Sequence, residues 1–153
     1  MGGIFNSFSI NASGLTAERF RMDVIAENVA NSETTRTEDG TPYVRKVVTF
    51  RERQNPVASF SSMLASTQSK YNRFVGSGVK VGGVYHDVTT EMKMVYDPSH
   101  PDADENGYVW YPNVDIVTEM TNLIDASRAY EANATAFNTS KQMALKGLEV
   151  GQA

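Results

Sequence analysis

Residues 114–148, VDIVTEMTNLIDASRAYEANATAFNTSKQMALKGL, are the stretch that decides the fold. Its apolar residues recur at alternating steps of three and four, the spacing of a helix face that packs against another helix. The stripe comprises Ile116, Met120, Leu123, Tyr130, Ala134, Phe137, Ala144 and Leu148. Such a helix would be ~50 Å long, whereas a compact globule of this chain length would be about 40 Å across. The sequence therefore predicts an elongated protein whose longest helix depends on other chains.

A second stripe of small residues runs along the same predicted helix. It comprises Ala126, Ala129, Asn133, Ala136 and Ser140, again at steps of three and four. A face of small residues lets another backbone approach closely. The alternative is that these alanines reflect only the high helix propensity of alanine.

The beginning of the chain repeats the helical pattern. Phe8, Leu15, Met22 and Val29 recur every seven residues and predict a helix over residues 4–29. Gly14 and several polar residues weaken its first half. We therefore expect the helix to be firm from about Thr16 and to end near Ser32.

Between the helices, alternating apolar and β-branched residues predict short strands at residues 43–50, 79–84, 92–96 and 108–111. The predicted fold class is α+β, with long terminal helices that pair in a coiled-coil-like manner and a small antiparallel β region between them. We expect residues 1–32 and 113–150 to form a helical axial core. Residues 33–112 would form the β-rich region, with a flexible loop at about 51–78, and Asn113 would cap the second helix.

The composition excludes several classes of protein. The chain has 153 residues, a formal net charge of −4 and no basic block that could bind nucleic acid. It has no cysteine for disulfides or thiol chemistry, and no apolar run approaches the ~20 residues of a membrane span. No cleavable export signal begins the chain, and no cluster of acid, base and nucleophile indicates an enzyme or a cofactor site.

The sharpest candidate for a ligand site is a partial calcium loop, formed by Asp102, Asp104 and Asn106 with Gly107. Alternate oxygens could converge there on a hard cation. However, Asn113 stands where a bidentate Glu is expected at the end of such a loop. The alternative, which we favour, is a hairpin turn whose side chains bond to nearby backbone N–H groups.

Several motifs resemble those of bacterial flagellar rod and hook proteins, and among them the proximal rod proteins. The segments are AENVANSET (residues 26–34), ETTRTEDGTPY (33–43), YDPSHPDADENGY (96–108), YPNVD (111–115) and ASRAYEAN (126–133). The motif residues carried by the resemblance are Asn28, Asn31, Pro98, Pro101, Gly107, Pro112, Asn113 and Asn133. Residues 51–78 match no motif of that family.

The resemblance implies a structural subunit of the flagellar basal-body rod, without enzymatic activity or cofactor. Such subunits leave the cell through the flagellar type III export apparatus, without a cleavable signal. Expected partners are the rod proteins FlgB, FlgF and FlgG, the junction protein FliE, and further copies of the same chain. The residues expected to pack between helices or subunits are Phe8, Leu15, Met22, Val29, Ile116, Met120, Leu123, Tyr130, Phe137 and Leu148. A small calcium-dependent binding module remains the alternative function.

Overall fold

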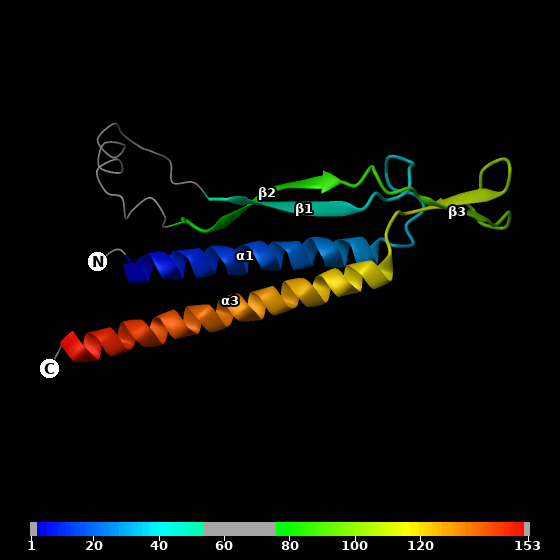
Figure 1. Cartoon of the computed structure of the whole chain (residues 1–153). Helices are drawn as coiled ribbons and strands as arrows, with labels where there is room; N and C mark the ends of the chain where they lie inside the picture. The colour runs from blue at the N-terminus through cyan, green and yellow to red at the C-terminus, as the bar shows by residue number, and fades with distance from the viewer. Residues whose placement is uncertain (1–2, 54–75, 152–153) are drawn as a thin grey trace, which may run out of the picture. The chain divides into compact units, whose positions relative to one another are not determined.

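The computed structural model describes residues 3–53 and 76–151, and it has the predicted α+β class (Figure 1). The elements follow in the order α1 (Gly3–Ala30), β1 (Lys46–Glu52), β2 (Val79–His86), β3 (Lys93–Tyr96), β4 (Tyr108–Tyr111) and α3 (Ile116–Gly151). The strands form two separate two-stranded sheets, β1 with β2 and β3 with β4. Most of the predicted flexible loop at residues 51–78 lies outside the described residues.

The strands lie close to where alternation placed them. β4 covers the predicted residues, β2 runs two residues further, and β1 begins at Lys46 instead of Tyr43. The late start of β1 has a physical cause. The backbone N–H of Tyr43 donates to the Thr34 carbonyl, and that of Arg45 donates to the side chain of Asn113. Neither N–H is therefore available for a strand ladder.

The chain divides into two compact units. One comprises residues 1–17, 50–81 and 130–153, and the other comprises residues 18–49 and 82–129. Within the first unit, the rings of Phe8 and Phe137 meet edge to face at 5.0 Å. Within the second, the side chains of Asn28 and Glu119 are hydrogen-bonded. Each unit thus joins a part of α1 to a part of α3.

The buried face of α1 combines small, branched apolar and polar residues, and that of α3 combines small and polar residues. The buried positions are Gly14, Ala17, Val24, Ile25 and Asn28 on α1, and Glu119, Ala126 and Ser140 on α3. Glu119, Ala126 and Ser140 lie on the small-residue stripe or on its extension by seven residues. The inward face of α3 therefore includes part of the small-residue stripe, whose Ala136 is exposed, together with half-buried Leu123 and Phe137 of the apolar stripe.

The residues expected to pack between helices or subunits are less buried. Half-buried are Phe8, Leu15, Met22, Val29, Leu123 and Phe137, whereas Ile116, Met120, Tyr130 and Leu148 are exposed. Their exposure in the single chain leaves these side chains accessible to neighbouring subunits. Their role between subunits stays a prediction.

A close approach of β2 to α1 holds the first unit together. Ser13 Oγ donates to the Ile10 carbonyl at 2.7 Å and accepts the backbone N–H of Val79 at 3.0 Å. Gly78 precedes this contact with φ +97°, and a Cβ built there would lie 2.2 Å from Ser13 Oγ. The contact therefore requires glycine, both for its backbone conformation and for space. It also holds the early half of α1, which begins at Gly3 despite its weak helix formers.

Replacing Gly78 tests this contact. We expect Gly78→Ala to lower the free energy of unfolding by about 2 kcal/mol or more, because the positive φ alone costs a non-glycine residue about 1–2 kcal/mol and the clash adds to it. The matched control is Gly76→Ala, whose Cβ would meet nothing within 4 Å. Urea unfolding measures both variants. Equal midpoints would contradict the close approach.

Candidate functional site

Asn28, near the end of α1, is the centre of a buried polar cluster. Its side chain is 1 % exposed. Oδ1 accepts from the Lys46 backbone N–H and the Tyr43 hydroxyl, both at 2.9 Å. Nδ2 donates to the Lys46 carbonyl at 2.8 Å and to Glu119 Oε2 at 2.9 Å. All four hydrogen bonds that a carboxamide can make are formed, so the start of β1 and the first turn of α3 are both tied to α1.

Glu119 carries the negative charge of this cluster, and it is also 1 % exposed. Its Oε1 accepts from two groups of Arg45, Nε at 2.9 Å and Nη2 at 2.6 Å. Arg45 Nη1 lies 3.3 Å from Asp87 Oδ2. Burial lowers the pKa of Arg45, but the hydrogen bonds and charges of Glu119 and then of Asp87 outweigh it and raise this pKa. The guanidinium therefore stays charged between two carboxylates.

Tyr43 closes the other side of the cluster. Burial, followed by the negative charges of Glu27 and Glu119, raises the pKa of Tyr43 to about 12. The hydroxyl consequently keeps the proton that it donates to Asn28.

Asn113 connects the loop before α3 to both β segments, and it does not cap the helix as the sequence led us to expect. Its Oδ1 accepts the Arg45 N–H at 2.8 Å, and its Nδ2 donates to the carbonyls of Asp87 at 2.7 Å and Thr90 at 3.1 Å. The cap is Asp115, which accepts the Val117 N–H through Oδ1 at 3.1 Å. The prediction was wrong because the Asn113 side chain is already occupied by these three contacts.

Asp87 is held ionised by its own turn. The hydroxyl and backbone N–H groups of Thr89 and Thr90 all donate to its carboxylate, at 2.7 to 3.2 Å. These bonds, with that of the Thr89 hydroxyl the strongest, hold the pKa of Asp87 well below its usual value. A permanent charge therefore faces Arg45.

The other motif residues shape turns and close contacts. Asn31 ends α1, with Nδ2 donating to the Glu27 carbonyl at 2.9 Å. Gly107 takes φ +82° in the β3–β4 connection, where a Cβ would meet the Tyr96 ring at 3.0 Å and Pro98 at 3.3 Å. Asn133 lies against Gly14, Pro112 is fully buried and Pro101 is exposed. These positions serve the architecture of the two units.

The structure gives the calcium module no support. Asp102 accepts from the Thr35 hydroxyl at 2.8 Å and pairs with Arg36 at 3.7 Å. Asp104 instead accepts the backbone N–H groups of Asn106 and Tyr108. No cluster of three potential metal ligands occurs among the described residues. Asp104 therefore bonds within the hairpin turn as we favoured from the sequence, whereas Asp102 binds side chains outside the turn.

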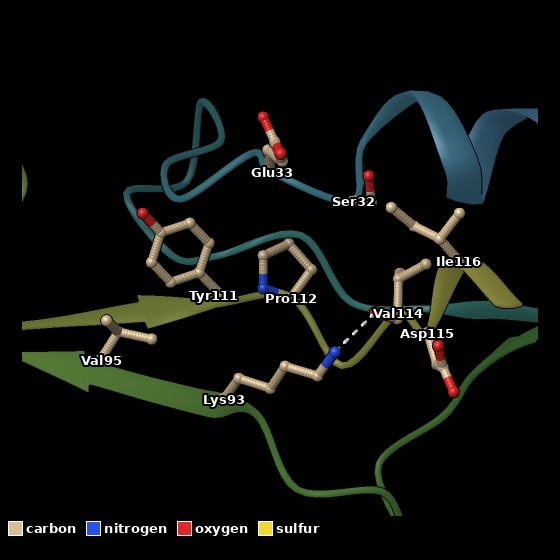
Figure 2. A pocket seen from close by; sticks show the side chains of 9 residues that line it. All are labelled: Ser32, Glu33, Lys93, Val95, Tyr111, Pro112, Val114, Asp115 and Ile116. Carbon is tan, nitrogen blue, oxygen red and sulfur yellow. Dashed lines mark hydrogen bonds between the residues drawn. The ribbon is translucent and has the colours of Figure 1, made fainter.

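A groove of about 440 Å³ opens beside the loop that precedes α3 (Figure 2). Its lining comprises Ser32, Glu33, Lys93, Val95, Tyr111, Pro112, Val114, Asp115 and Ile116. Lys93 Nζ reaches toward the Val114 carbonyl at 3.5 Å, as the dashed line in Figure 2 shows. The walls are mainly apolar and the lining holds neither histidine nor cysteine.

Within residues 3–53 and 76–151, neither helix combines the length and the apolar character that crossing a membrane requires. The buried cluster fastens the helices to the β segments, while many large apolar side chains remain outside. This arrangement is that of a structural subunit with surfaces left for neighbours.

Comparison with known proteins identifies the class. Residues 8–36 match the family model "Flagella basal body rod protein", and residues 105–150 match "Flagellar basal body rod FlgEFG protein C-terminal". The chain is thus a flagellar basal-body rod protein.

Curated relatives narrow this class. "Flagellar basal-body rod protein FlgC" of Bacillus subtilis (strain 168) is 45 % identical, over 97 % of this chain and 98 % of the relative. The protein of the same name from Borreliella burgdorferi is 42 % identical over 98 % and 99 %, and that of Escherichia coli O6:H1 is 40 % identical over 97 % and 98 %. The chain belongs to the FlgC family and is a structural subunit of the flagellar basal-body rod. The resemblance seen in the sequence is confirmed.

Removing Glu119 tests the buried cluster. We expect Glu119→Ala to lower the free energy of unfolding by about 3–5 kcal/mol, because it leaves Arg45 Nε and Nη2 and an Asn28 N–H without their acceptor. The control is Glu27→Ala, which breaks an ion pair with Lys46 at a residue that is 43 % exposed and should cost less than about 1 kcal/mol. Urea unfolding compares the two, and similar losses would contradict a cluster that stabilises the fold.

The lowered pKa of Asp87 predicts acid sensitivity. Its stabilisation is complete above the pKa of an unfolded aspartate, about 3.9, and is lost as the pH falls through the lower folded value, because the unfolded chain then binds the extra proton. The variant Asp87→Asn cannot titrate. The difference in urea midpoint between wild type and variant should be constant down to about pH 5 and shrink below about pH 4. A difference that does not depend on pH would refute this assignment.

Proposed function

We propose that this chain assembles helically with its neighbours into the shaft of the rod and transmits motor torque to the hook. Residues 1–32 and 113–150 would form the axial core, with residues 33–112 further out. The partners would be the rod proteins FlgB, FlgF and FlgG, the junction protein FliE and other copies of this chain. Delivery would use the flagellar export apparatus without a cleavable signal.

The observation that carries this proposal is the end of α3. Met143, Leu145, Leu148 and Val150 are all more than half exposed. At about 100° per residue, Met143 and Val150 lie on one side of the helix, and Leu145 and Leu148 lie on the other. A helix that is apolar on several sides is normally enclosed by protein, so these turns require neighbouring subunits.

The free energy of burial supports a role for these side chains in holding neighbouring subunits together. Each large apolar side chain that moves from water into a subunit contact contributes roughly 1.5–3 kcal/mol. Interdigitated side chains along two helices would therefore resist shear between neighbours. A structural subunit of a rotating shaft requires this property, and no chemical step is needed.

The test is a charge placed on this end of α3. We expect Leu148→Asp to abolish rod assembly and swimming, because Leu148 is 64 % exposed in the single chain and would carry an unpaired charge into a subunit contact. Expression and unfolding midpoint should stay normal. The readouts are soft-agar swimming and the yield of hook–basal bodies from a strain without its own copy.

The matched control is Gln142→Asp, which places the same charge at an exposed polar position earlier in the same part of α3. This variant should assemble and swim. Normal swimming by cells that carry Leu148→Asp would overturn the proposed packing of α3.

A further inference from the structure

The β3–β4 hairpin presents an aromatic face. Its antiparallel register pairs Met94 with Trp110 and Tyr96 with Tyr108. Paired residues lie on the same side of a sheet, and alternate residues share that side. These four residues therefore form one surface, which we call the aromatic face. The rings of Tyr96 and Tyr108 meet edge to face at 5.2 Å.

This face is open, while the opposite side of the hairpin is covered only at Val109. The four side chains of the aromatic face are 36–64 % exposed; on the other side Val109 is completely buried and its pair partner Val95 is 47 % exposed. Since aromatic side chains have ~150–250 Å² each, the face offers roughly 400 Å² of apolar surface. A contiguous apolar patch of this size is comparable to the largest patch on a typical monomer, which is often functional. A two-stranded sheet is also only marginally stable by itself, so a covering partner would stabilise it.

A matching surface lies on the first turns of α3. The residues Ile116, Val117, Met120 and Ile124 are 44–73 % exposed. At about 100° per residue they fall within an arc of about 100°, away from the buried Glu119. We call this surface the α3 ridge. Its length of ~12 Å along the helix matches the ~13 Å of a four-residue strand.

We propose that the aromatic face of one copy docks on the α3 ridge of a second copy of this chain. The inference rests on the proposed function, because it supplies a contact between rod subunits. Two different patches on one chain make a heterologous contact, which propagates into an open helical array when the rotation does not close. Identical patches would stop at a dimer.

The area indicates when this contact forms. About 400 Å² on each copy is half of the roughly 800 Å² per partner in a standard stable interface. One pair is therefore weak by itself and becomes stable where each subunit has other neighbours. A second copy fits this surface because the same chain supplies both patches, and each remains exposed within its own chain.

Cross-linking tests the docking directly, because the chain contains no cysteine. Cells without their own copy would express two versions together, Met94→Cys and Met120→Cys, and their isolated hook–basal bodies would be treated with a short bismaleimide. We expect a cross-linked dimer of this chain. The control pair replaces Met94→Cys by Val88→Cys, which is 86 % exposed and lies outside both surfaces. It should give only monomer.

The outcomes separate this inference from the proposed function. A chain that is present in basal bodies but gives no dimer, or links to a different rod protein, overturns the docking and leaves the rod role standing. Absence of the wild-type chain from basal bodies overturns both. Emission of Trp110, the only tryptophan, in the purified cysteine variants checks that the hairpin has folded.

A charge exchange provides the second measurement. Met94→Lys or Met120→Glu alone places a charge against an apolar surface and should reduce assembled rods about tenfold or more, since each 1.4 kcal/mol of lost contact is tenfold. The two substitutions in one chain bring opposite charges together between copies and should restore assembly. A double variant no better than either single one would refute the pairing.

Discussion

The structure depends on one side chain whose hydrogen bonds are all formed, the carboxamide of Asn28. A buried polar group that lacks hydrogen-bond partners costs about 1–3 kcal/mol of folding free energy. Asn28 can therefore be buried only where all four of its hydrogen bonds form. Two of them go to the N–H and carbonyl of Lys46, as a neighbouring strand would bond. The others hold the Tyr43 hydroxyl and Glu119. A single amide thus fixes where β1 lies against α1 and which face α3 presents.

Ion pairs connect the Asn28 cluster to further segments of the second unit. Because Glu119 is buried, it needs the guanidinium of Arg45, and Arg45 in turn faces Asp87. The backbone N–H of Arg45 is bonded to Asn113, which also binds the Asp87 carbonyl. The start of β1, the turn after β2 and the loop before α3 are therefore mutually dependent. Removing one partner leaves the others buried without compensation.

Sequence patterns predicted the α+β class and the positions of the strands, because these features arise from local alternation and helical periodicity. They did not predict which helix face turns inward. The apolar stripe is exposed at Ile116 and Met120 but half-buried at Leu123 and Phe137, while Ala126 of the small-residue stripe is fully buried. Glu119 lies seven residues, or two helical turns, before Ala126 and therefore shares its face of the helix. The polar cluster could not be predicted from the sequence, because Asn28 and Glu119 are 91 residues apart in the chain and no local spacing connects them.

The buried polar face and the exposed apolar face of α3 have different roles. Polar groups with strict hydrogen-bond geometry define one arrangement within the chain, whereas large apolar side chains supply most of the free energy of association. Keeping Glu119 inside is tolerable only because Arg45 and Asn28 satisfy it completely. The internal polar cluster therefore defines the arrangement of the second unit while large apolar side chains of α3 remain exposed.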